Sequence, residues 1–130
     1  MSNDGDKGGG GGGGGGGPDL VQYIVVHRVK GYGVGALIAQ GAHASSAALH
    51  LSRDQPDTAA YLAALDSMHK VVLEGPSAEA LRETAAALDA AGVVHKLWVE
   101  QPEGIVTALA SAPRARAVLK PLFAAFKLLR

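Results

Sequence analysis

Hydrophobic residues along the chain follow two periods, one typical of strands and the other of helices. Residues 20–29, LVQYIVVHRV, are rich in β-branched and aromatic side chains and apolar on both faces, which predicts a strand covered on both sides. Shorter apolar runs at 69–75, 93–100 and 104–110 predict further strands. The short QPE turn between the last two favours an antiparallel pair.

Helical spacing describes most of the chain between these runs. The first helix is predicted over residues 35–52, with a core stripe of Leu37, Ala44, Ala48 and Leu51. Asp57 is expected to cap a second helix. Ser77 has the residue type of an N-cap for a third helix, which ends before Gly92.

A final helix is predicted at the C-terminus. Ser111 and Pro113 are expected to start it, PLFAAFKLL continues it, and Pro121 kinks or restarts it. The order strand, helix, helix, strand, helix, strand, strand, helix predicts an α/β sandwich on a four-stranded mixed sheet flanked by helices.

Composition changes this picture mainly at the two ends. Ten of the 18 glycines lie consecutively from Gly8 to Gly17, so residues 1–18 are expected to be a disordered glycine-rich tail and residues 19–130 a single domain. Twelve acidic residues balance twelve basic ones over the 130-residue chain, but residues 111–130 contain five basic residues and no acid. Only this basic end points to a partner.

The chain contains no cysteine and no apolar run long enough to span a bilayer, which leads us to expect a cytoplasmic protein without membrane contact. On the predicted final helix Arg116, Lys120, Lys127 and Arg130 share one face, where they are able to contact RNA phosphates. An ordinary solvated helix end is an equally good interpretation.

The glycine cluster of GYGVGALIAQ stands between a strand and a helix, where a phosphate-binding loop would lie. Gly31, Gly33 and Gly35 have the wrong spacing for a dinucleotide fingerprint, and no Lys followed by Ser or Thr completes a Walker loop. A turn from strand to helix is therefore the favoured interpretation.

Polar residues border the core stripe of the first helix. Gln40 and His43 lie one turn apart and are able to orient a water or an ester carbonyl. The alternative, favoured by the residues alone, is that both side chains bond to loops and His50 is only exposed. The spacing of His43 and His50, without a carboxylate partner, argues against a metal site.

Three stretches, GALIAQGAHASSAALH, MHKVVLEGPSAEAL and HKLWVEQPEGI, together resemble the type 2 peptidyl-tRNA hydrolases, and within them the divergent peptidyl-tRNA hydrolase domain-containing branch. The resemblance covers residues 20–130. It implies a mixed sheet flanked by helices, hydrolysis of the ester between a peptide and tRNA, peptidyl-tRNA or tRNA as partner, and no metal or organic cofactor.

The resemblance also implies which residues form the site. Gln40 and His43 match the family's A-A-Q-x-x-H-A pattern, and Glu100 stands where the family has an aspartate. Val34 and Ala36 replace two family lysines, and Gly104 replaces a threonine.

On this basis Gln40 and His43 are expected to orient ester or RNA, and Glu100 to polarise water. Lys30, Arg116, Lys120 and Lys127 are expected to contact RNA.

Loss of a cation and a hydroxyl removes several kcal/mol of transition-state stabilisation, since one oxyanion donor is worth about 3 kcal/mol. We therefore expect hydrolase activity to be weak or lost. The alternative is a non-catalytic module that binds tRNA or a protein on the same fold. The oligomeric state, a homodimer included, and the protein partners stay open.

Overall fold

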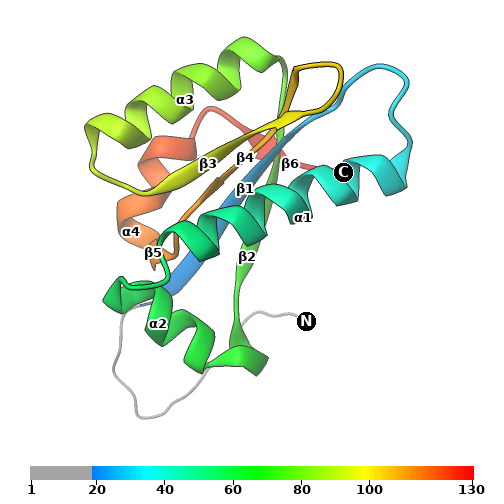
Figure 1. Cartoon of the computed structure of the whole chain (residues 1–130). Coiled ribbons are helices and arrows are strands. Elements are labelled where there is room, and N and C mark those ends of the chain that lie inside the picture. The colour runs from blue at the N-terminus through cyan, green and yellow to red at the C-terminus, as the bar shows by residue number, and fades with distance from the viewer. Residues whose placement is uncertain (1–18) are drawn as a thin grey trace.

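The computed structural model describes residues 19–130, and the tail expected over residues 1–18 lies outside this part. Its centre is a mixed sheet with helices on both faces, as predicted, but the sheet has six strands rather than four (Figure 1). The strands are β1 (Leu20–His27), β2 (Lys70–Gly75), β3 (His95–Glu100), β4 (Ile105–Ser111), β5 (Arg114–Ala115) and β6 (Lys127–Leu128). The helices are α1 (Val34–Leu51), α2 (Pro56–Ala63), α3 (Ala78–Ala90) and α4 (Arg116–Leu119), with 3₁₀ turns η2 (Leu65–Ser67) and η3 (Lys120–Phe123).

The strand order is β3-β4-β1-β2-β6, and β5 pairs with β1. β1 runs parallel to β2 and antiparallel to β4, so the chain crosses over through α1 and α2 before it returns to the sheet. β3 lies at an edge with β4 as its neighbour. The carboxyl ends of β1 and β2 and the β3–β4 turn therefore meet at one end of the sheet, the upper end in Figure 1.

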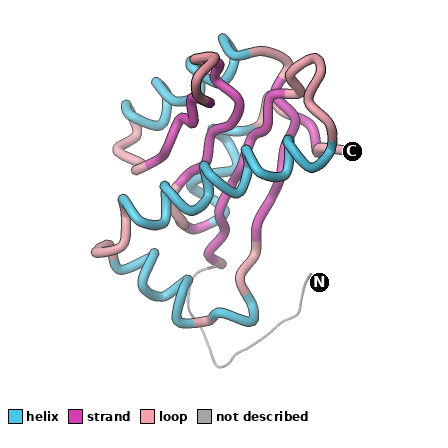
Figure 2. Tube along the Cα trace, turned by 45° about the vertical axis from the view of Figure 1, so that its right-hand side comes forward, coloured by secondary structure: helices cyan, strands magenta, loops and turns pink. Residues whose placement is uncertain are grey.

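Apolar side chains form one core on each face of the sheet, and helices cover both (Figure 2). The cluster on the α1 face consists of Ile24, Val26, Leu37, Ala44, Ala48, Ala108 and Ala110. The cluster on the α3 face consists of Val21, Tyr23, Val25, Leu73, Leu81, Ala85, Leu88, Val93, Val106, Leu109, Leu119 and Phe123. The predicted double coverage of the first strand is thus confirmed, whereas Leu51, predicted to be in the core, is exposed.

A buried polar network fixes α1 over the sheet. Gln22 of β1 is fully buried, and its Nε2 donates to the carbonyls of Ser45 at 3.2 Å and Ser111 at 3.0 Å. Its Oε1 accepts from Ser45 Oγ at 2.7 Å and Lys70 Nζ at 2.6 Å. Because buried amides are costly unless both ends are bonded, this network sets the position of α1 relative to β1, β2 and β4.

The glycine cluster makes a turn, as the residues favoured. Gly31 has φ of +91°, a left-handed conformation that suits glycine, and Tyr32 N donates to the Val29 carbonyl at 3.0 Å. Gly33 is the N-cap of α1. The cap predicted for the second helix is wrong: Gln55 is the N-cap of α2, Pro56 follows, and Asp57 lies in the first turn.

The predicted C-terminal helix is wrong as well. α4 ends at Leu119, the chain tightens into η3 around Pro121, and Lys127 then pairs with Glu74 as part of β6. Proline lacks an N–H and cannot continue an α-helical ladder, and the open edge of β2 offers backbone partners to the segment that follows. Lys127 therefore does not share a helix face with Arg116.

None of the helices within residues 19–130 is both long and apolar enough to cross a bilayer.

Candidate functional site

Glu100, the last residue of β3, lies at the centre of a polar cluster between β3, β4 and α1. Trp98 Nε1 donates to Glu100 Oε1 at 3.0 Å, and Gln40 Nε2 donates to Glu100 Oε2 at 3.3 Å. Trp98 and Glu100 are two residues apart on one strand, so their side chains point to the same face. Each oxygen of the carboxylate is thus held by a neutral donor.

Gln40 reaches Glu100 from the buried side of α1, where its side chain is only 3% exposed. Thr107 Oγ1 donates to Gln40 Oε1 at 2.8 Å. Since a hydroxyl donor marks the oxygen of the amide, this bond directs the NH₂ group of Gln40 towards Glu100. The order of the chain of bonds is therefore Thr107 to Gln40 to Glu100.

A β-bulge brings Thr107 to this face. Trp98 pairs with Ala108 and the next residue, Val99, pairs with Val106, which leaves Thr107 without an opposite residue. Such a bulge redirects the side chain of the extra residue. Ala108 consequently belongs to the α1-face cluster and Thr107 bonds to Gln40 of α1, while Val106 belongs to the α3-face cluster.

We expect Thr107→Val to destabilise the protein by about 1–3 kcal/mol, because the buried Gln40 carbonyl loses its donor. Thr107→Ser keeps the hydroxyl and should cost clearly less. Urea unfolding of the two variants measures the difference. Equal losses would mean that the hydroxyl contributes nothing and that only the side-chain volume matters.

The surroundings of Glu100 lower the pKa of its carboxyl below the ordinary 4.5. The largest cause is the hydrogen bond from Trp98; partial desolvation acts in the opposite sense, and the Gln40 bond and the charge of His43 lower the pKa further. Donors to an ionised carboxylate favour the charged form. Glu100 is therefore an anion at neutral pH, suited to accepting a hydrogen bond rather than giving a proton.

His43 follows Gln40 by one helical turn and lies against Trp98. The two rings are stacked, with centroids 4.6 Å apart and an angle of 13° between their planes. His43 is exposed, whereas Trp98 is half-buried and packs on the α1-face cluster. Tyr32 packs on the same cluster, and burial and the charges of Glu103 and Glu100 raise its pKa.

The structure thus places Gln40, His43 and Glu100 near one another and adds Trp98 and Thr107, which sequence reasoning missed. The alternation of HKLWVE offered a signal for Trp98, since it puts Trp98 and Glu100 on one face. Thr107 could not be predicted in this way, because the β-bulge changes the direction of its side chain. Gly104 has φ of +72°, where a β-branched residue is strained, so this turn is unsuited to the threonine that the family has at that position.

The positions of the family's lysines carry no cation near Glu100. Val34 is 71% exposed and Ala36 is half-buried at the start of α1. Within residues 19–130 the side-chain donors to Glu100 are Trp98 and Gln40, and no ion pair includes Glu100. Lys30 is exposed before α1, and its expected contact with RNA stays a prediction.

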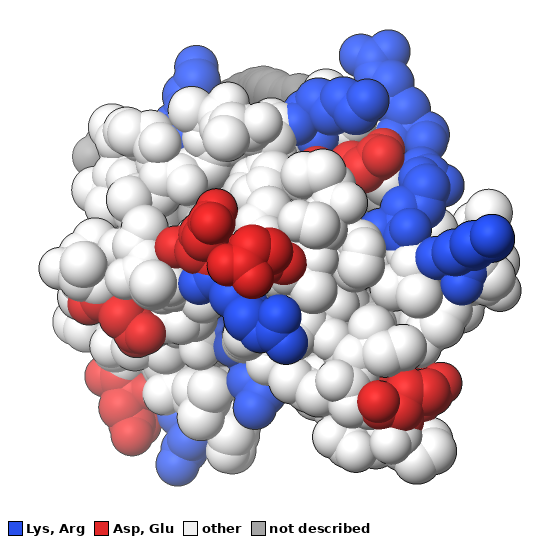
Figure 3. All heavy atoms as spheres, turned by 90° about the horizontal axis from the view of Figure 1, so that it is seen from above, with Lys and Arg blue, Asp and Glu red and all other residues white. Residues whose placement is uncertain are grey.

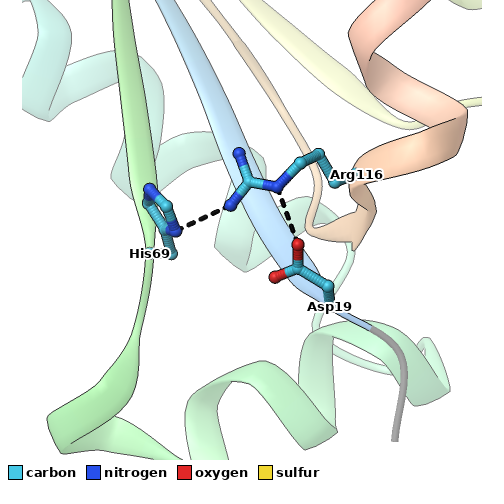
Figure 4. A network of polar contacts seen from close by, with 3 residues as sticks. All are labelled: Asp19, His69 and Arg116. Atoms are coloured by element: carbon cyan, nitrogen blue, oxygen red, sulfur yellow. Dashed lines mark hydrogen bonds and ion pairs between the residues drawn. The ribbon is translucent and has the colours of Figure 1, made fainter. Parts of the chain in front are cut away.

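Arg116 is engaged within the protein, as Figure 4 shows. Its Nε donates to Asp19 Oδ2 at 2.7 Å, and its Nη2 lies 2.8 Å from His69 Nδ1. Burial, followed by the charge of Arg116, lowers the pKa of His69, which favours the neutral ring that accepts this bond. Arg116 is the first residue of α4, and it bonds to Asp19, which precedes β1, and to His69, which precedes β2. A phosphate would have to compete with these two partners.

Lys120 and Lys127 are both exposed, and their expected role in RNA binding stays a prediction. Lys127 lines a shallow pocket of about 440 Å³ with Arg28, Glu74, Leu128 and Arg130. This pocket does not include Glu100. Figure 3, a view from above, shows several Lys and Arg side chains gathered toward the upper right of this face with an acidic side chain among them, and further basic and acidic side chains elsewhere on the face.

Comparisons with known proteins show the family of the chain. A family model described as Peptidyl-tRNA hydrolase PTH2 matches residues 20–129. The Homo sapiens protein named "Putative peptidyl-tRNA hydrolase PTRHD1" is 48% identical over 99 residues, which are 72% of this chain and 71% of that protein. The Mus musculus protein of the same name is 42% identical over 116 residues, 85% of this chain and 83% of that protein.

Proposed function

Because the chain belongs to the type 2 peptidyl-tRNA hydrolase family, we propose that it hydrolyses the ester joining a peptide to the terminal ribose of tRNA, with Glu100 at the centre of the site. The observation that carries this proposal is the pair of hydrogen bonds that the Glu100 carboxylate accepts, one from Trp98 and one from Gln40. A carboxylate fixed in this way is pre-organised, so it loses little freedom when a substrate binds.

In this proposal Glu100 orients the attacking water by accepting its hydrogen bond, and the proton moves to the carboxylate as the water oxygen bonds to the ester carbonyl carbon. When the tetrahedral intermediate collapses, the bond between the carbonyl carbon and the ribose oxygen breaks, and the proton passes from Glu100 to the departing ribose oxygen. The low pKa of Glu100 makes it a weak base, so its contribution is mainly to position the water and to offset positive charge on it.

Gln40 supplies the second element of the proposed mechanism. One hydrogen of its Nε2 bonds to Glu100, and the other has no recorded acceptor within residues 19–130. We assign this second hydrogen to the ester carbonyl oxygen, where negative charge develops. The Thr107 bond keeps the amide in the orientation that this needs.

A low rate follows from the same geometry. Ala36 stands where the family has a lysine, and loss of one donor to an oxyanion lowers kcat by about a hundredfold to a thousandfold. Gly104 has no hydroxyl, but the bond from the buried Thr107 keeps Gln40 in place as a remaining donor. We therefore propose a slow but functional hydrolase.

The absence of a cation beside Glu100 in the described part of the chain favours a second candidate, a module that binds tRNA or a protein without hydrolysis. Incubation of the purified protein with an N-blocked aminoacyl-tRNA distinguishes the two. Release of the blocked amino acid above the spontaneous rate supports the hydrolase. Retention of the tRNA on the protein without release supports the module. If neither release nor retention is observed, both candidates are wrong.

The role of Trp98 gives a pH-dependent prediction. A carboxyl whose pKa is lowered in the folded protein stays ionised until the pH falls through that low value, so the acid limb of kcat/KM should lie below pH 4.5 in the wild type. Trp98→Phe keeps a ring but removes the strongest donor. We expect its acid limb to move to higher pH, as measured by initial rates over a pH series, and an unmoved limb would contradict the role of Trp98.

A further inference from the structure

The stack of His43 on Trp98 has an outer surface that the proposed mechanism does not use. Trp98 packs against the α1-face cluster, and the His43 ring stacks on one face of its indole. His43 is exposed, and its ring has no recorded hydrogen-bond partner within residues 19–130. The His43 imidazole is therefore the exposed ring of a two-ring stack, called the pile below, and the Trp98 indole is the ring that packs on the core.

The carboxylate lies at the edge of this pile. Trp98 Nε1, in the plane of the indole, donates to Glu100 Oε1 at 3.0 Å, and the His43 ring stacks on the face of the indole with centroids 4.6 Å apart. Because His43 is exposed, a planar group stacked on its outer face would extend the pile and lie a few ångströms to the side of the proposed hydrolytic centre. Stacking surfaces of this kind accept any nucleobase, since every base has a π-face.

We propose that the His43–Trp98 pair is a stacking platform for a nucleobase, and that it receives the 3′-terminal base of the RNA. The assignment rests on the proposed function, because the scissile ester is attached to the ribose of that same nucleotide. The base and the ester belong to one nucleotide, and His43 and Glu100 both contact the same indole, that of Trp98. His43 accordingly positions the substrate and takes no proton.

This role differs testably from proton transfer by His43. Stacking needs only a flat ring, so a phenylalanine at position 43 should still bind the base. A group that transfers a proton needs the imidazole nitrogens, which phenylalanine lacks. His43→Phe is consequently the informative variant, His43→Ala removes the platform, and His50→Ala is the matched control. His50 is an exposed histidine on the same helix, two turns further on.

The chain offers its own probe, since Trp98 is its only tryptophan. The experiment is a fluorescence titration of the full chain with the RNA trinucleotide CCA, and with the same trinucleotide carrying an abasic 3′ ribose. The indole is excited at the red edge of its band, where nucleobases do not absorb. We expect saturable quenching by CCA and much weaker binding of the abasic form.

His43→Ala should weaken CCA binding by roughly fivefold to 150-fold, the range expected for loss of one stacked base. His43→Phe should stay within about threefold of the wild type, and His50→Ala should be unchanged. Thermal unfolding of each variant verifies folding, and His43→Phe provides the comparison if His43→Ala is unstable.

Equal binding of CCA and the abasic form, or wild-type affinity in His43→Ala, would overturn the platform. Loss of binding in His43→Phe equal to that in His43→Ala would overturn it as well. The measurement involves no ester, so it is independent of hydrolysis. Turnover of aminoacyl-tRNA without base-dependent quenching would refute the platform alone, and base-dependent quenching without turnover would refute the hydrolase alone.

Discussion

Glu100→Gln is expected to lower kcat/KM for an N-blocked aminoacyl-tRNA by about a hundredfold or more, the usual contribution of a positioned acid–base group. The amide has nearly the shape of the carboxylate but carries no charge and cannot take a proton. It also presents an NH₂ group where Trp98 or Gln40 now donates, which sets two donors against each other. The change should therefore lower the stability as well, by about 1–3 kcal/mol, and the rates are compared at a temperature where thermal unfolding shows both proteins to be folded.

Glu103→Gln is the matched control, because Glu103 carries the same charge in the exposed β3–β4 turn. Its kcat/KM should stay close to that of the wild type. Single-turnover measurements with excess protein separate chemistry from binding. If both variants lose activity equally, the effect comes from the general charge of the turn, and the central role of Glu100 is wrong.

Phe123→Ala should be the most destabilising single change in the C-terminal segment. Phe123 is 2% exposed, belongs to the α3-face cluster and stacks on Tyr23 with ring centroids 4.8 Å apart. Truncation of a buried phenylalanine costs about 3–5 kcal/mol, which corresponds to a fall in Tm of roughly 12 °C or more for a domain of this size. Thermal unfolding followed by circular dichroism measures it.

Val118→Ala is the control for this prediction, since Val118 lies in α4 of the same segment but is 49% exposed. It should change the free energy of unfolding by no more than about 0.5 kcal/mol. A similar small effect for Phe123→Ala would show that the segment from Arg116 onward packs on the sheet only loosely.

The central elements were predictable from the sequence because their patterns are local. β1 is apolar on both faces, and the N-cap predicted at Ser77 is present, with Ser77 Oγ accepting from Ala80 N at 3.1 Å. The C-terminal segment was not predictable in this way. Its apolar spacing suits a helix, but Pro121 and the open edge of β2 determine its path, and the second of these is a tertiary effect.

The site was predictable to the extent that family resemblance marked its residues. Resemblance named Gln40, His43 and Glu100, and the structure places them together. Thr107 escaped because its direction depends on a bulge, which shifts the pairing of two strands and leaves no periodic signal. Arg116 was expected to contact RNA, and its ion pair with Asp19 could not be foreseen because it joins residues 97 positions apart in the chain.

The place of β3 at the edge of the sheet has a consequence for motion. Gln40 and Thr107 are buried, and Thr107 belongs to β4, which has a strand on each side, whereas Trp98 and Glu100 belong to a strand whose only strand neighbour in the described sheet is β4. Edge strands open locally at a lower free energy than central ones. The proposed site thus combines residues of the interior with residues of a strand that has a hydrogen-bonded neighbour on one side only, so backbone amides of β3 should exchange with solvent faster than those of β1 and β4.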